Sequence, residues 1–254
     1  MLRVRVIPVL LLQNGGLVKT FRFKQPKYVG DPINAVKIFN MKEVDELAFL
    51  DIHASVHGTE PNYDLIGDIS SEAFMPFSYG GGISNLEQIR KLTGIGVEKV
   101  ILNTASFANP DLVSQAANLL GSSSIVVSID YKRSLFGKSN IYTRAGREKV
   151  ASDIVAQARR FESIGAGEIL LQSIDRDGMQ LGYDTHMIAS VADSVEIPVI
   201  AMGGAAGLED FRAAVDAGAS AVGAGSVFVF HGRHKAVLIT YPDYDELTRL
   251  FDQD

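Results

Sequence analysis

The segment Phe74–Phe107, FMPFSYGGGISNLEQIRKLTGIGVEKVILNTASF, has a counterpart at Glu196–Phe228, EIPVIAMGGAAGLEDFRAAVDAGASAVGAGSVF. An offset of 122 residues, about half the chain, pairs Pro76 with Pro198. The same offset pairs Gly81 with Gly203, Gly82 with Gly204, Leu86 with Leu208, Glu87 with Glu209, Arg90 with Arg212 and Gly96 with Gly218. Each copy consists of an apolar run, a glycine-rich turn, an amphipathic stretch and a second apolar run. An internal repeat of this kind predicts two similar structural halves.

The same alternation of short strands and helical patterns continues outside the repeat. Several predicted strands, such as Ile125–Val127, are apolar without alternation, which is typical of strands buried on both faces. The predicted strands are Arg3–Leu11, Glu46–Ile52, Met75–Tyr79, Lys99–Leu102, Ser124–Ile129, Glu168–Gln172, Pro198–Met202 and Ala221–Ala224. Eight strand–helix units in 254 residues favour an α/β fold, a (βα)8 TIM barrel built from two (βα)4 halves, over an open doubly wound sheet. No Pro-, Ser- or charge-rich stretch divides the chain, so we expect one domain over residues 1–254.

Composition limits the possible functions. The chain carries 24 Lys and Arg against 30 Asp and Glu, and this net charge of −6 disfavours nucleic acid as a partner. It has no cysteine, which excludes disulfides, thiolate metal sites and a cysteine nucleophile. No apolar run approaches the roughly 18 residues of a membrane span, and the first residues become polar too quickly for a secretory signal. We therefore expect a soluble, cytoplasmic protein that binds neither nucleic acid nor membranes.

Both copies of the repeat carry glycines between a strand and a helix, at Gly80–Gly82 and at Gly203–Gly204. Glycine allows the backbone to approach a ligand closely, and a helix N-terminus offers free N–H donors to an anion. The next strands end in Asn103-Thr104 and Gly225-Ser226. The pattern predicts two phosphate cups at the C-terminal end of the barrel, one of Gly82, Asn103 and Thr104 and one of Gly204, Gly225 and Ser226. The same glycines would also suit tight turns alone. Two facing cups would suit a substrate with a phosphate at each end.

Longer strings indicate a family. GAGEILL at Gly165–Leu171 and SIDRDG at Ser173–Gly178 are specific rather than general barrel features. With them, the chain resembles the cyclase subunit (HisF) of imidazole glycerol phosphate synthase over essentially its whole length. The other matching stretches are Ile7-Pro8, Gly15–Lys19, Gly30–Pro32, Phe49–Ile52, Gly80–Ile83, Asn103-Thr104, Ile129-Asp130, Gly182–Asp184, Ile197–Ile200 and Ser226–Phe228.

The resemblance implies a (βα)8 barrel that receives ammonia from a HisH-like glutaminase docked on its N-terminal face. Ammonia would cross the barrel and attack a bis-phosphorylated ribulosyl-formimino carboxamide ribotide. That reaction needs no cofactor. A metal is not expected either, because the five histidines give no convincing set of three ligands.

The family's chemistry uses two carboxylates as general acid and base, and Asp130 fits one of these positions. The other lies in the first strand, where the family reads Ile-Pro-Cys-Leu-Asp-Val. Here Ile7–Leu12 reads Ile-Pro-Val-Leu-Leu-Leu, so Leu11 occupies the position of the aspartate and can neither donate nor accept a proton. Gln172, Met179 and Met202 also depart from the residues common in the family at the reactive face.

The opposite face keeps the family's pattern. The resemblance implies a ring of alternating charges that gates ammonia at the N-terminal end of the barrel. The matching residues are Arg5, Glu46, Lys99 and Glu168. Ordinary salt bridges at the bottom of a barrel are the alternative.

The chain is most similar to a diverged branch of the family, associated with sugar amidation in bacterial surface-polysaccharide (O-antigen) synthesis. Leu10–Thr20 and His234–Pro242 carry that branch's motifs. In that branch, barrel and glutaminase are thought to supply ammonia to a separate sugar amidotransferase, which makes an acetamidino sugar. Two alternatives stay open: an authentic cyclase of histidine biosynthesis that manages with Asp130, and a non-catalytic scaffold that activates a glutaminase.

Further side chains are candidates for the same site. Lys19 lies in a long first loop and either reaches a substrate phosphate as a lid residue or is solvated. Asp51 ends the second strand and either binds substrate or caps the next turn. Asp175–Gly178 either lines the mouth or forms a turn held by its own side chains. Tyr241, Tyr244, Leu247 and Leu250 indicate the buried stripe of a final helix.

Overall fold

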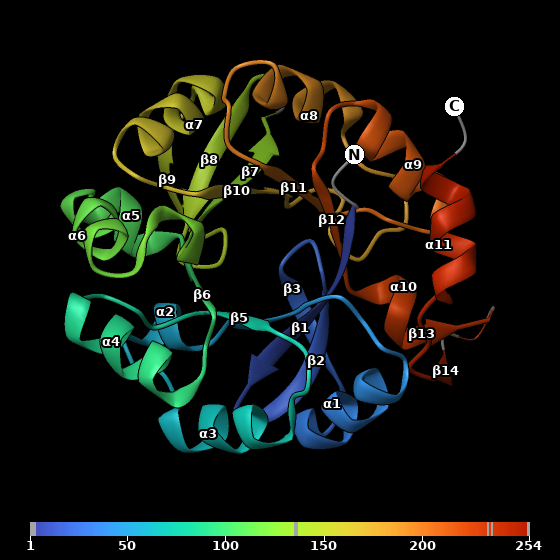
Figure 1. The fold of residues 1–254 in the computed structure, drawn as a ribbon. Coiled ribbons are helices and arrows are strands. Elements are labelled where there is room, and N and C mark those ends of the chain that lie inside the picture. The colour runs from blue at the N-terminus through green and yellow to red at the C-terminus, as the bar shows by residue number, and fades with distance from the viewer. Residues whose placement is uncertain (1–3, 135–136, 233, 235, 253–254) are drawn as a thin grey trace.

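Eight parallel strands close into a barrel in the computed structural model, which describes residues 4–134, 137–232, 234 and 236–252. In order around the barrel the strands are β1 (Arg5–Gln13), β4 (Leu47–Asp51), β5 (Phe77–Gly80), β6 (Lys99–Leu102), β7 (Ile125–Arg133), β10 (Glu168–Ser173), β11 (Val199–Met202) and β12 (Ala221–Ala224). Pairing of β12 with β1 and of β7 with β10 closes the ring. The predicted (βα)8 barrel is confirmed, with helices surrounding the strands (Figure 1).

Each predicted barrel strand coincides with an observed one, with ends that differ by a few residues. The predicted first strand began at Arg3, which lies outside the described residues; β1 runs from Arg5 to Gln13. The fifth barrel strand extends beyond the predicted Ile129 as far as Arg133, because its end pairs with an antiparallel strand.

The repeat in the sequence is a repeat in the structure. The elements β5, α4 (Leu86–Ile95), β6 and α5 (Thr104–Ala108) are followed half a chain later by β11, α9 (Leu208–Asp216), β12 and α10 (Ser226–Val229). The strands β5 and β11, and likewise β6 and β12, begin and end at positions 122 residues apart. The predicted similarity of the two halves is therefore confirmed for these elements.

Two β-hairpins that the sequence did not indicate project from the C-terminal end of the barrel. The expected long first loop is wrong: β2 (Gly16–Phe21) pairs antiparallel with the end of β1, and β3 (Lys24–Gly30) pairs with β2. The second hairpin consists of β8 (Ser139–Thr143), paired with the end of β7, and β9 (Glu148–Ala151). Both hairpins are continuous with the barrel sheet.

The remaining elements lie outside the barrel strands. They are α1 (Pro32–Met41), α2 (Ala54–His57), α3 (Tyr63–Glu72), α6 (Asp111–Leu120), η1 (Ser122–Ser124), α7 (Ile154–Ser163), α8 (Thr185–Ala192), β13 (Phe230–His231), β14 (Ala236–Val237) and α11 (Tyr244–Phe251). The stripe predicted for the final helix is wrong in part. Leu247 is buried, but Tyr244 is 63% exposed and Tyr241 precedes the helix. No helix in the described part of the chain is long and apolar enough to cross a membrane.

The inside of the barrel is apolar between two polar ends. Alternate residues of each strand point inward, and those in the middle form one buried cluster that includes Ile7, Val9, Ala48, Ile101, Val126, Leu170, Ile200 and Ala221. Towards the C-terminal ends of the strands the inward positions become polar, with Asp130 on β7 and Gln172 on β10 facing a cavity. Towards the N-terminal ends they become charged. The fold thus places two separate polar sites on one axis.

Candidate active site

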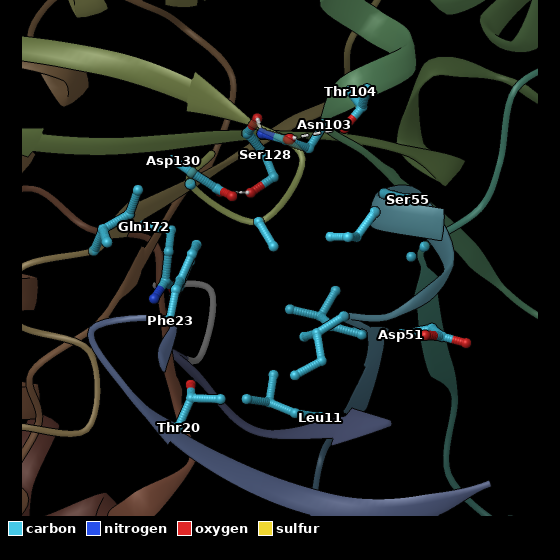
Figure 2. Close-up of a pocket in the computed structure, with 18 of the residues that line it drawn as sticks. Leu11, Thr20, Phe23, Asp51, Ser55, Asn103, Thr104, Ser128, Asp130 and Gln172 are labelled. Carbon is cyan, nitrogen blue, oxygen red and sulfur yellow. Dashed lines mark hydrogen bonds between the residues drawn. The ribbon is translucent and has the colours of Figure 1, made fainter. Parts of the chain in front are cut away.

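A cavity of about 470 Å³ opens at the C-terminal end of the barrel. Barrel strands supply its floor, including Leu11, Asp130, Gln172 and Met202, and the two hairpin tips supply part of its rim. This is the end at which TIM-barrel enzymes place their active sites, because the loops that follow the strands converge there. Figure 2 shows Leu11 and Asp130 on opposite sides of the cavity.

Asp130 is a buried acid that lines the cavity. Its side chain points toward Ser128, whose hydroxyl donates a hydrogen bond of 2.6 Å to Asp130 Oδ1 (Figure 2). Asp130 is only 8% exposed, and this burial raises its pKa to about 7, with a further increase from the negative charge of Asp177. The Ser128 hydrogen bond acts in the opposite direction. A carboxyl group with this pKa exchanges a proton near neutral pH, as general acid–base catalysis requires.

Leu11 has no such capacity. It is 8% exposed, packs in the apolar interior cluster and pairs in register with Leu50 and Val18. Two carboxylates besides that of Asp130 line the cavity, one from Asp51 and one from Asp177, in the turn after β10. Thr20 Oγ1 donates to Asp177 Oδ2 at 2.9 Å, and burial raises the pKa of Asp177 despite this bond.

The first predicted cup is assembled at one side of the cavity. Gly81 and Gly82 have φ angles of 120° and 72°, and a Cβ at Gly81 would lie 2.5 Å from the Asp51 carbonyl oxygen, so glycine is required there. Asn103 Nδ2 donates to the Ser128 carbonyl oxygen, and Thr104 Oγ1 accepts from the Arg144 N–H at 3.1 Å. The structure therefore brings the residues of the first cup together at the cavity. The side chains of Asn103 and Thr104 also form hydrogen bonds with neighbouring backbone groups.

The second cup lies next to a smaller pocket that contains Gly204, Gly225, Ser226 and Lys19. Lys19 is not in a loop: it lies in β2 and is 4% exposed. Its ammonium donates to the Val9 carbonyl oxygen at 2.7 Å and lies against Gly225. Burial lowers the pKa of Lys19 to about 8, and the charge of Asp177 only partly offsets this. The structure thus places the lysine beside the second cup, and its contact with a phosphate stays a prediction.

Asp51 caps the next turn, and its contact with a substrate stays a prediction. Its Oδ1 accepts from the N–H groups of His53 and Ala54 at 2.9 and 3.0 Å, which holds the turn into α2, although the residue also lines the cavity. Asp175 likewise accepts from the Arg133 N–H. No group of three metal-ligating side chains was found among the residues that the structure describes.

Sequence reasoning missed Ser128 and gave no role to Gln172 beyond its departure from the family. Ser128 lies two residues before Asp130 in a strand and therefore shares its face, which is a signal that the sequence contained. Gln172 pairs in register with Asp130, and its Oε1 is buried without a hydrogen-bond partner among the described residues. A buried acceptor beside the cavity is available to a donor on a bound ligand.

The opposite end of the barrel carries a closed ring of ion pairs. Arg5 lies 2.6 Å from Glu46 and 2.9 Å from Glu168, and Lys99 lies 3.5 Å and 2.9 Å from the same two glutamates. Burial alone would lower the pKa of Arg5, but the charges of both glutamates outweigh it and raise the pKa. The four residues come from three strands and the segment just before β4, so the predicted set converges at the barrel axis. Passage of ammonia through the ring stays a prediction.

The fold and the two sites define a (βα)8-barrel protein with an acid-containing mouth at one end and an ion-paired ring at the other. Comparison with known proteins gives the family. The model of the histidine biosynthesis protein family matches residues 5–235. The chain belongs to this family, and within it to the HisF proteins.

Named relatives cover nearly the whole chain. A Pseudomonas aeruginosa protein, provisionally named imidazole glycerol phosphate synthase subunit hisF2, is 50% identical over 97% of this chain and 99% of its own. A Leptospira borgpetersenii protein, provisionally named HisF subunit of the same synthase, is 45% identical over 99% of this chain and 100% of its own. The imidazole glycerol phosphate synthase subunit HisF of Streptomyces coelicolor is 43% identical over 90% of this chain and 91% of its own.

Proposed function

We propose that this chain is the ammonia-accepting barrel of a glutamine amidotransferase complex, working with a HisH-like glutaminase on its N-terminal face. In the proposal its own chemistry has diverged from ring closure, and the ammonia serves amidation of a bacterial surface-polysaccharide sugar by a separate amidotransferase. The observation that carries the proposal is the pairing of a retained ion-pair ring with a mouth in which Leu11 faces Asp130.

The ring and the interior are compatible with transfer of a small neutral molecule. Arg5, Lys99, Glu46 and Glu168 balance one another's charge, so the ring itself carries no net charge toward a passing molecule. Beyond the ring the inward side chains are apolar or small, such as Ala48, Ser78 and Ala221. Of these three, only Ser78 is polar, and its hydroxyl donates to Glu46 Oε1 at 2.7 Å. Ammonia would leave the ring into an interior with few groups that could protonate it.

The mouth supports the second part of the proposal. Ring closure by the family's reaction needs an acid and a base on opposite sides of the substrate, and Asp130 supplies one of them. Leu11 supplies no proton donor or acceptor. Loss of one member of such a pair commonly costs about 10²- to 10⁴-fold in rate. The two cups, with Lys19 beside the second, would still bind a phosphorylated ligand in the proposal.

A direct test mixes the purified barrel with the family's ribotide substrate and saturating ammonium, and follows the imidazole product. We expect turnover at least about 100-fold below that of a cyclase whose first strand carries the aspartate. Turnover equal to such a cyclase would overturn the diverged function and establish the authentic cyclase. Leu11→Asp should raise any residual rate, and Leu11→Asn, of similar size but without an acidic proton, is the matched control.

A second measurement separates an ammonia-conducting barrel from a scaffold. The cognate glutaminase is assayed with and without the barrel, and glutamine-dependent transfer to the sugar amidotransferase is measured with wild type and with Lys99→Met. Stimulated glutaminase activity together with ring-dependent transfer supports the proposal. Stimulated glutaminase activity without any effect of Lys99→Met on ammonia transfer would support the alternative, a non-catalytic scaffold that activates the glutaminase.

A further inference from the structure

The tips of the two hairpins meet above the cavity. A Cβ placed on Gly146, between β8 and β9, would lie 3.3 Å from the ring of Phe23, between β2 and β3, so the Phe23 ring packs on the Gly146 backbone. The first tip is anchored from below, because the Arg22 N–H donates to the Asp177 carbonyl oxygen at 2.9 Å. The second is anchored at the first cup, because the Arg144 N–H donates to Thr104 Oγ1. These contacts fix the backbone of both tips over the cavity.

Cations gather at this junction. Arg22 and Lys24 from the first tip and Arg147 from the second line the cavity, and their side chains have no hydrogen-bond or ion-pair partner among the residues that the structure describes. Arg144 lies beside them, with its guanidinium donating to the Val56 carbonyl oxygen at 3.1 Å. We call Arg22, Lys24, Arg144 and Arg147 the cationic collar.

Among the described residues, no carboxylate that lines the cavity forms an ion pair with the collar. Asp51 caps the turn into α2, Asp130 accepts from Ser128 and Asp177 accepts from Thr20, so each carboxylate is held by other groups. Like charges on the two neighbouring tips repel each other, and the contact between the tips keeps the two segments close together. An anion in the opening would remove this repulsion.

The backbone at both tips forms tight hairpin turns. Arg22 and Arg144 both have φ of 51°, in the left-handed region that glycine occupies most readily. Phe23 and Ala145, the next residues of the same turns, also have positive φ, as tight hairpin turns require. The turns therefore set the backbone positions from which Arg22 and Arg144 extend at the two tips.

We propose that the cationic collar binds a second phosphoryl group linked to the one in the first cup, so that the mouth takes a diphosphate-bearing ligand. The inference deepens the proposed function, because it relies on the first cup as a phosphate site. Arg144 fixes the spacing, since its backbone contacts Thr104 of the cup while Arg147, three residues on, lines the cavity. Guanidinium groups suit this task because they bind phosphate oxygens through two parallel hydrogen bonds.

The test is calorimetric titration of the full chain with pyrophosphate and with orthophosphate, without divalent metal and at one fixed salt concentration. We expect wild type to bind pyrophosphate at least about tenfold more tightly than orthophosphate. The triple variant Arg22→Gln/Lys24→Gln/Arg147→Gln should lose this difference and keep its orthophosphate affinity within about twofold. Its matched control is Lys42→Gln/Lys138→Gln/Lys149→Gln, which removes three exposed cations that do not line the cavity.

Equal affinity of wild type for the two anions would overturn the collar as a diphosphate site. An equal loss of the preference for pyrophosphate in both triple variants would also overturn the proposal, because the preference would then come from the overall charge of the protein. Failure of orthophosphate to bind at all would count instead against the first cup. The same comparison between uridine diphosphate and uridine monophosphate distinguishes an esterified ligand from the free diphosphate ion.

Discussion

Replacing Asp130 with Asn is expected to stabilise the fold at pH 8 and to leave its stability nearly unchanged near pH 4. The ordinary pKa of the aspartate is 3.8, and burial raises it to about 7 in the folded chain. Asparagine keeps the size of the side chain and an oxygen that can accept the Ser128 hydrogen bond, but it carries no charge. The substitution therefore isolates the free energy of holding a carboxylate in the cavity.

The sign follows from proton binding. Between pH 3.8 and about 7 the folded state keeps a proton on Asp130 that the unfolded state has released, so the stability of wild type falls as pH rises. Each pKa unit corresponds to 1.36 kcal/mol, so the loss amounts to about 4 kcal/mol once pH exceeds the folded pKa. Because Asp130 is only 8% exposed, water offsets little of this cost.

Urea unfolding at half-unit steps from pH 4 to 8.5 measures the difference directly. The free energy of unfolding of Asp130→Asn minus that of wild type should rise by about 4 kcal/mol over this range, most of it below pH 7. Asp68→Asn, in the exposed part of α3, is the control for loss of a negative charge and should show no such rise. A difference that stays constant with pH, or Asn destabilising at pH 8, would refute the argument.

Three further predictions concern the rest of the framework. Lys99→Met should lower the free energy of unfolding by about 1–2 kcal/mol in urea titrations, less than the roughly 3–5 kcal/mol of an isolated buried pair, because Arg5 still contacts both glutamates. Gly81→Ala should cost more than about 2 kcal/mol, because its Cβ would meet the Asp51 carbonyl oxygen, whereas Gly15→Ala, with φ of 80° and open space, should cost only about 1 kcal/mol. Wild type should gain about 3 kcal/mol over Lys19→Met between pH 8 and 10.5, because the buried ammonium loses its charge there before the unfolded lysine does; a flat difference would contradict this.

The barrel was predictable because its signals are local and repeated. Runs such as Ile125–Val127 indicate buried strands, and the repeat around Pro76 and Pro198 fixes both the order and the spacing of four elements in each half. The hairpins were not predictable in the same way. In β3 the first five residues are all exposed, so no alternation of apolar and polar residues marks the strand, and its pairing with β2 is interrupted by register shifts.

The sequence predicted which residues form the candidate site better than it predicted what surrounds them. Asp130 and the ring residues follow from resemblance, although Arg5 and Glu168 are 163 positions apart in the chain. The environment of Lys19 did not follow, because its burial depends on β2 folding back over the Val9 carbonyl oxygen. Leu11 belongs to the apolar interior because of its place in β1. Asp177 lines the cavity from a turn, and the sequence left open whether that turn lines the mouth or is held only by its own side chains.

In the part of the chain that the structure describes, charges are paired at the N-terminal end of the barrel and include unpaired cations at the C-terminal end, and this difference constrains which molecules each end can admit. In the ring, each of the two cations lies within 3.5 Å of both carboxylates, so the ring presents no net charge and holds no fixed charge free for an ionic ligand. At the mouth, the carboxylates are engaged below while Arg22, Lys24 and Arg147 stay unpaired among the described residues. A neutral molecule is therefore not disfavoured at the ring, and an anion gains at the mouth. Raising the salt concentration should weaken anion binding at the exposed collar and leave the buried ring nearly unchanged, because mobile ions screen exposed charges far more than buried pairs.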